Sequence, residues 1–116
     1  MSRSGLEYLR HILSEADYLL SRSGGLSRGE FMRDETVRRA FVRSLEVIGE
    51  AAKQVPDELK SKYSHVEWKA MAGMRDRIIH GYDTVDLGVV WNVVTQDIPS
   101  IRPGLRQILA DYEKGD

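Results

Sequence analysis

The chain has 116 residues, a length that fits a single domain spanning residues 1–116. Its 17 basic and 18 acidic residues give a net charge of −1, which excludes a protein that coats a polyanion through overall charge and limits any nucleic-acid contact to a local patch. Cysteine is absent, which excludes disulfides, thiol catalysis and thiolate metal sites, and the lack of a signal-peptide core or an apolar run of roughly 20 residues predicts a soluble, cytoplasmic protein.

The N-terminal third of the chain carries a helical hydrophobic pattern. Apolar residues recur at three- and four-residue steps over residues 4–22, and Ser23-Gly24-Gly25 ends this first predicted helix. Ser27 and Glu30 then form an S-x-x-E capping box, which predicts a short second helix through about Met32.

A long third helix is predicted after Asp34, whose side chain is suited to an N-cap. Its apolar stripe has the steps 4, 4, 3, 4 and 3 and consists of Val37, Phe41, Leu45, Ile48, Ala52 and Val55. Pro56 is expected to end it, because proline lacks the N–H that a helix interior needs. Glu46 and Glu50 lie one turn apart on this helix and are interpreted as a polar edge.

The second half of the chain predicts short turns over residues 56–63, a fourth main helix over residues 66–80, and a last helix capped by Asp86. Pro99 and Pro103 fall inside the last pattern, so we expect this helix to be kinked or split near residues 97–103. Strand signals are nearly absent. The expected fold is all-α, an antiparallel bundle of four main helices with additional short helical turns.

The start of the last predicted helix is apolar on more than one side. The residues concerned are Leu87, Val89, Val90, Trp91, Val93 and Val94. A bundle of this size would have difficulty covering all of them, so they belong either to the core or to a partner surface. This pattern favours a homodimer.

Residues 74–83 form the stretch with the densest polar chemistry, with two arginines, two aspartates, a histidine and a tyrosine. Read as a helix, the stretch places Asp76 and His80 one turn apart on one face, and Arg75 and His80 roughly 140° apart around the axis. Gly81 is expected to end the helix in a left-handed C-terminal cap. A lone helical histidine is usually a solvated or capping residue, but the whole collection favours a functional interpretation.

A family resemblance rests on this stretch and on five further matches along the chain. Arg75-x4-His80-x-Tyr82 matches the R-x4-H-x-Y motif of HEPN domains. Further matches in order are Ile48-Gly49-Glu50-Ala51-Ala52-Lys53, Val55-Pro56, Trp68-x3-Met71-Ala72-Gly73-Met74-Arg75-Asp76, Val90-Trp91 and Asp97-Ile98-Pro99. From about Glu35 to Leu109 the chain therefore resembles the HepT-type toxins of HepT/MntA toxin–antitoxin systems.

The resemblance implies a HEPN-like helical bundle that forms a homodimer in which the two motifs face a shared cleft. It implies a metal-independent endoribonuclease toxin that acts on RNA and is neutralised by an MntA-like minimal nucleotidyltransferase antitoxin. By this resemblance Arg75 and His80 are the catalytic pair, Asp76 is a supporting residue and Tyr82 accepts AMP. The chain itself would need no cofactor and no metal, because ATP is used by the antitoxin.

The chemistry of metal-free RNA cleavage gives a physical reason for the dimer. The reaction needs a base for the 2′-hydroxyl, an acid for the leaving 5′-oxygen and positive charge at the phosphate. Two copies of His80 and Arg75 around one cleft would supply these roles, and Asp76 could orient the imidazole or hold Arg77. The alternatives are a non-catalytic HEPN module that docks a nucleotidyltransferase partner or a nucleotide, and a purely structural bundle.

Overall fold

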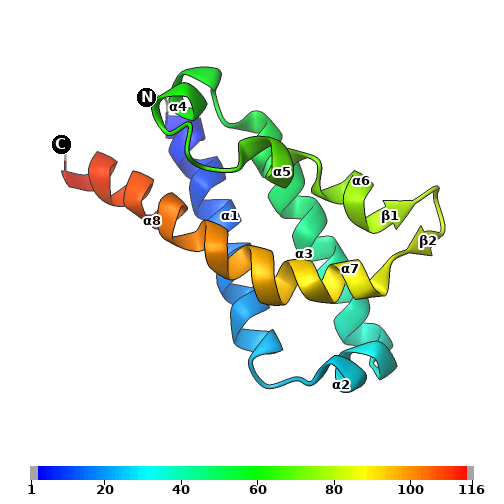
Figure 1. Ribbon diagram of the computed structural model, residues 1–116. Coiled ribbons are helices and arrows are strands. Elements are labelled where there is room, and N and C mark those ends of the chain that lie inside the picture. The colour runs from blue at the N-terminus through cyan, green and yellow to red at the C-terminus, as the bar shows by residue number, and fades with distance from the viewer. Residues whose placement is uncertain (1–2, 115–116) are drawn as a thin grey trace.

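The computed structural model describes residues 3–114, and its elements follow one another in the order seen in Figure 1. The helices are α1 (Arg3–Ser23), α2 (Arg28–Arg33), α3 (Glu35–Gln54), α4 (Asp57–Lys62), α5 (Trp68–Ala72), α6 (Met74–Ile78), α7 (Leu87–Asn92) and α8 (Ile98–Lys114), with the π-helical turn η1 (Val93–Asp97) between the last two. The only strands among these residues are β1 (Ile79–His80) and β2 (Thr84–Val85). The all-α prediction is confirmed.

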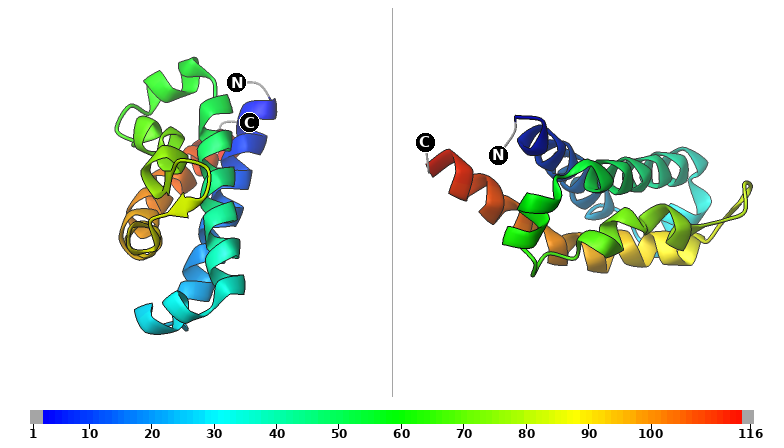
Figure 2. Two further views of the ribbon diagram at one scale, coloured as in Figure 1. Left: turned by 90° about the vertical axis from the view of Figure 1, so that its right-hand side faces the viewer. Right: turned by 90° about the horizontal axis from the view of Figure 1, so that it is seen from above.

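The helices form two layers, which Figure 2 shows from the side and from above. Helices α1 and α3 run antiparallel in one layer, and α5, α6 and the continuous path from α7 to α8 form the other. Helix α2 connects the two long helices at one end of the molecule (Figure 1). None of the helices within residues 3–114 combines the length and the apolar character that crossing a membrane requires.

Three helices begin at the N-cap residues that the sequence predicts. Ser27 and Glu30 form the reciprocal capping box of α2, Asp34 accepts the Val37 N–H at the start of α3, and Asp86 accepts the Val89 N–H at the start of α7. Each of these side chains satisfies a backbone donor that has no partner inside its own helix. These helix starts are therefore determined by residues only three apart in the sequence.

The core lies between the two layers and contains the complete predicted stripe of α3. Phe31 of α2 is fully buried, with ring centroids 5.4 Å from Phe41 and 5.2 Å from Trp91, so α2 joins α3 to α7. In the apolar segment at the start of the last predicted helix, Val90, Val93 and Val94 are buried, and the remaining residues are partly buried against the core: Leu87, Val89 and Trp91. A single chain thus covers most of this segment, and the homodimer stays a prediction.

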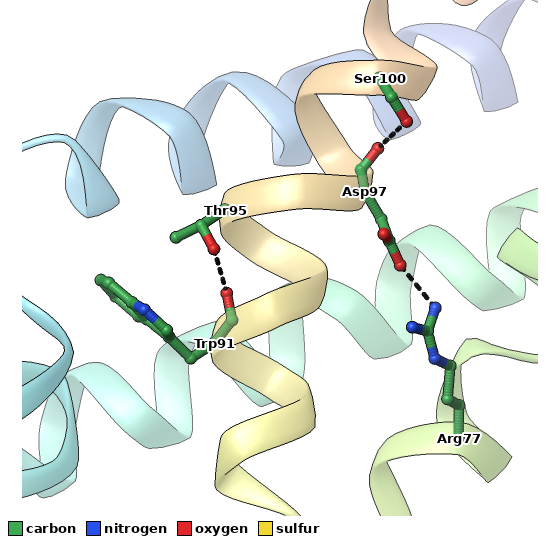
Figure 3. Close-up of polar contacts among 5 residues, drawn as sticks. All are labelled: Arg77, Trp91, Thr95, Asp97 and Ser100. Atoms are coloured by element: carbon green, nitrogen blue, oxygen red, sulfur yellow. Dashed lines mark hydrogen bonds and ion pairs between the residues drawn. The ribbon is translucent and has the colours of Figure 1, made fainter.

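The predicted last helix is interrupted close to the expected place. The π-helical turn η1 lies between α7 and α8, and the Ile98 N–H donates to the Val93 carbonyl five residues earlier. Pro99 follows directly, and a proline ring would clash with the carbonyl four residues before it in a regular α-helix. The wider π-turn relieves that crowding and changes the helix direction. Thr95 Oγ1 donates to the Trp91 carbonyl at 2.8 Å, as Figure 3 shows.

The prediction of one continuous fourth helix over residues 66–80 is wrong. This segment is divided at Gly73 into α5 and α6, and its helical part ends at Ile78 rather than at His80. Residues 79–80 instead pair antiparallel with residues 84–85, in the register Ile79 with Val85 and His80 with Thr84. Gly81 has the expected positive φ of 74°, but it lies in the hairpin turn and not in a helix cap. Consequently Asp76 and His80 do not share a helix face.

Candidate functional site

The four residues of the predicted site occupy α6 and the hairpin that follows it. Arg75 and Asp76 lie in α6, His80 ends β1, and Tyr82 lies in the turn between the strands. All four are exposed: the side chains of Arg75 and His80 are 51% and 59% accessible, and Tyr82 is 94% accessible. A ligand can therefore reach each of them, and no hydrogen bond or ion pair within residues 3–114 joins them to one another.

Helix α6 is held against α3 by a close backbone approach. Met74 and Ile78 lie one turn apart and are buried, which orients the short helix with Arg75 exposed between them. Gly49 of α3 faces the end of α5: a Cβ at this position would lie 3.1 Å from the Met71 carbonyl oxygen. Glycine thus permits the contact between α3 and the α5–α6 break, and this contact sets the position of Arg75 relative to α3.

Arg75 has an acidic neighbour on α3. Its Nε lies 3.6 Å from Oε2 of Glu46, whose side chain is 27% accessible. This ion pair uses the inner nitrogen of the guanidinium. No hydrogen bond within residues 3–114 engages the guanidinium, so its two terminal nitrogens, which form a fork that binds a phosphate, can donate to a ligand. Glu46 therefore positions the arginine while leaving its phosphate-binding edge available.

His80 has an acidic neighbour beyond the hairpin. Its Nε2 lies 3.9 Å from Oδ2 of Asp86, and the other oxygen of the same carboxylate accepts the Val89 N–H that it caps. The Asp86 N–H in turn donates to the Ile78 carbonyl at 2.8 Å, which closes the hairpin on the end of α6. The distance of 3.9 Å is too long for a hydrogen bond, so the pair is electrostatic and requires a protonated imidazole.

Asp76 was expected to orient the imidazole of His80 or to hold Arg77, but other carboxylates of the chain lie next to these two residues. Arg77 is held by Asp97 of η1, with Nη1 and Oδ2 2.5 Å apart (Figure 3), and His80 is approached by Asp86. Asp76 is exposed in the first turn of α6 and has no hydrogen-bond or ion-pair partner within residues 3–114. A supporting role for Asp76 toward a substrate or a second chain stays a prediction.

Glu46 and Asp86 were not predicted from the sequence as members of the site. Asp86 was predicted only as a helix cap, and Glu46 only as part of a polar edge. A hairpin prediction over residues 79–85 would have brought Asp86 next to His80, but the sequence contains no local signal that links Glu46 to Arg75. No group of three or more histidine and carboxylate side chains within residues 3–114 is arranged to hold a metal ion.

The chemistry of the site follows from these positions. It offers a guanidinium for a phosphate, an imidazole that can transfer a proton, and an exposed phenol that a second enzyme could modify. Each chain contributes one imidazole to this site. A reaction that uses one histidine as general acid and another as general base would therefore take its second imidazole from another chain, whereas Tyr82 and the carboxylates of Asp76 and Asp86 are further groups in this segment that can transfer a proton.

Comparison with known proteins identifies close relatives over most of the chain. The sequence model of the family described as "Ribonuclease HepT-like" matches residues 8–108. "Putative RNase TTE0752" of Caldanaerobacter subterraneus subsp. tengcongensis is 45% identical over 102 residues, which cover 88% of this chain and 91% of the relative. "Probable ribonuclease HepT" of Thermococcus cleftensis is 36% identical over 102 residues, covering 88% and 93% of the two chains. No solved structure matches the chain.

Proposed function

Because this chain belongs to the Ribonuclease HepT-like family, we propose that it is the toxin of a toxin–antitoxin system and cleaves RNA without a metal ion. The observation that carries this proposal is the pairing of two exposed groups with separate acidic neighbours, Arg75 with Glu46 and His80 with Asp86. Both groups are accessible and both are positioned by contacts outside their own segment.

In the proposed mechanism, the terminal nitrogens of Arg75 bind oxygens of the scissile phosphate and stabilise the charge that develops there. His80 takes the proton of the 2′-hydroxyl or gives one to the leaving 5′-oxygen. The second proton-transfer group comes from His80 of a second copy, which makes the active site a composite of a homodimer. The exposure of the Arg75 and His80 side chains is compatible with such an arrangement.

We further propose that a nucleotidyltransferase antitoxin inactivates the protein by transferring AMP from ATP to Tyr82. The near-complete exposure of this side chain supports the assignment, because a modifying enzyme must enclose the phenol that it adenylylates. The product places a phosphate and an adenosine in the three-residue turn directly after His80. The added negative charge would repel the phosphates of RNA, and the bulk would obstruct access to the site.

The test is RNA cleavage in EDTA by the chain freed of any antitoxin. Wild-type protein is expected to cleave, and His80→Ala is expected to lose cleavage while keeping its helical circular dichroism. His11→Ala is the matched control, because His11 is also an exposed histidine but lies on α1. Cleavage by His80→Ala at the wild-type rate would reject the mechanism. Binding of RNA without any cleavage by the wild type would favour a non-catalytic binding module.

A further inference from the structure

A cavity of about 480 Å³ lies beside the hairpin, between the first half of α3 and the start of α7. Its apolar part is formed by Val42 of α3, Val85 of β2 and Leu87 of α7, all of which are partly buried. This volume is within the range of roughly 300–1,000 Å³ that is typical of small-molecule sites. Apolar side chains from three elements thus form one surface against which a flat, aromatic group can pack.

The polar part of the cavity carries both signs of charge. Arg38 and Arg39 line it from α3, together with Glu35 from the same helix and Asp83 from the hairpin turn. Two arginines and two carboxylates give the lining no net charge, so attraction of a simple anion is not its main property. It suits a ligand that presents an anion and hydrogen-bond donors together.

Arg39 is a lining residue that a ligand can readily reach. Its side chain is 80% accessible and pairs with Glu35 at 2.8 Å, four residues earlier on the same helix. An exposed pair of this kind changes an equilibrium constant by less than a factor of about three, so a phosphate can replace Glu35 at little cost. Arg38 is more constrained, since its Nη1 donates to the Met32 carbonyl at the end of α2.

We propose that this cavity is a subsite for one nucleotide. The base packs on Val42, Val85 and Leu87, the phosphate binds Arg39, and Asp83 accepts a hydrogen bond from an amino group of the base or a hydroxyl of the ribose. This assignment rests on the proposed function, because the hairpin that forms one wall also carries His80 and Tyr82. Val85 pairs with Ile79, next to His80, and Asp83 directly follows Tyr82.

The nucleotide can have two sources that share this chemistry. One is a nucleotide of the RNA strand that flanks the bond to be cleaved. The other is the AMP group carried by Tyr82 after modification. In either case the subsite would hold a nucleotide beside the hairpin that carries His80 and Tyr82, and would bind it through Arg39.

The first experiment measures binding of a short single-stranded RNA whose 2′-hydroxyls are methylated, so that it cannot be cleaved. Arg39→Ala is expected to weaken binding about tenfold, as loss of a charge-assisted contact to phosphate implies. Arg43→Ala is the matched control, because Arg43 is an exposed arginine one turn later on α3 that lines a different cavity. Its expected change is below about twofold. Glu35→Gln is expected to tighten binding about twofold, because it removes the competing carboxylate.

The second experiment distinguishes the two sources by following the methyl resonances of Val42, Val85 and Leu87. Shifts on addition of the methylated RNA that disappear in Arg39→Ala identify the RNA strand as the source. Shifts only after AMP is attached to Tyr82 identify the modification as the source. Equal weakening by Arg39→Ala and Arg43→Ala, or the absence of methyl shifts in both arms, overturns the subsite.

These binding readouts use no cleavage step, so they separate the subsite from the proposed nuclease activity. A His80→Ala variant that still cleaves RNA would contradict the proposed mechanism without changing the methyl shifts. Conversely, wild-type cleavage in the absence of methyl shifts would leave the proposed function intact and reject the subsite alone.

Discussion

The carboxylate of Asp86 serves a helix and a histidine at the same time. One of its oxygens caps α7 by accepting the Val89 N–H at 3.1 Å, and the other lies 3.9 Å from Nε2 of His80. The side chain that fixes the start of α7 therefore also places a negative charge beside the proposed catalytic imidazole. This double role can be divided experimentally, because asparagine caps helices about as well as aspartate does.

We expect Asp86→Asn to keep the stability of the protein and to lower the rate of RNA cleavage about tenfold. Asp86→Ala should lower cleavage similarly and should also lose about 1 kcal/mol of unfolding free energy with the cap. Urea denaturation and single-turnover cleavage measure the two effects. Asp34→Ala is the control, since Asp34 caps α3 through the Val37 N–H and should affect stability alone. Wild-type cleavage by Asp86→Asn would exclude Asp86 from positioning His80.

The hydroxyl of Tyr82 is predicted to be the only acceptor of AMP. Intact mass measured after incubation with the antitoxin and ATP should show AMP on the wild type and none on Tyr82→Phe. Because Tyr82 is 94% accessible, its replacement by phenylalanine should leave the stability unchanged. Tyr18→Phe, which alters an exposed tyrosine on α1, should still gain AMP. The assignment fails if Tyr82→Phe gains AMP at the wild-type stoichiometry.

Two substitutions of glycine by alanine, one where α3 approaches α5 and one on α2, should differ in their effect on stability. At Gly49 the added Cβ would lie 3.1 Å from a backbone carbonyl oxygen, so the strain should exceed the gain in helix propensity and remove about 1 kcal/mol of unfolding free energy. At Gly29 of α2 the Cβ would lie 3.2 Å from a terminal nitrogen of Arg33, whose flexible side chain can move away. Gly29→Ala should therefore be neutral or stabilising. Equal midpoints of urea denaturation for both variants would contradict this account.

The buried phenol of Tyr63 should make the free energy of unfolding decrease at alkaline pH. Burial raises the pKa of the Tyr63 phenol to about 12, and the hydrogen bond that it donates to Asp111 at 2.8 Å and the charge of that carboxylate add to the shift. An unfolded tyrosine has a pKa of about 10, so between about pH 10 and 12 the unfolded chain releases a proton that the folded chain keeps. The stabilisation of the folded state by the protonated Tyr63 phenol is complete below about pH 10 and is lost as the pH rises from about 10 to 12.

Thermal unfolding at several alkaline pH values measures this effect against Tyr63→Phe, which keeps the ring but has no group to titrate. The midpoint of the wild type should fall more steeply between about pH 10 and 12 than that of Tyr63→Phe. Parallel pH profiles for the two proteins would show that the buried phenol does not contribute.

Much of the fold could be predicted from the sequence because the interactions responsible are local. The stripe of α3 repeats every three or four residues, and all six of its members are buried. Ser27, Asp34 and Asp86 cap helices through backbone groups three residues away. Pro99 signalled the interruption of the last helix, although the adjustment begins upstream of the proline as a π-turn.

The hairpin could not be predicted in the same way. The apolar spacing of Met74 and Ile78 is compatible with a helix that continues through His80, and nothing nearby in the sequence opposes that interpretation. In the structure, backbone pairing of residues 79–80 with residues 84–85 ends α6 at Ile78. This pairing also invalidates the angular separation of Arg75 and His80 that a continuous helix would impose.

The sequence by itself determined the helical architecture, the family and the polar stretch that contains Arg75, His80 and Tyr82. Only the tertiary structure decided which carboxylates accompany these residues. Glu46 reaches Arg75 from α3, Asp97 holds Arg77 from η1, and Asp86 approaches His80 from beyond the hairpin. Helix propensity and capping act over a few residues, whereas these ion pairs depend on how α3, α6 and α7 pack, and that packing is set by the buried core.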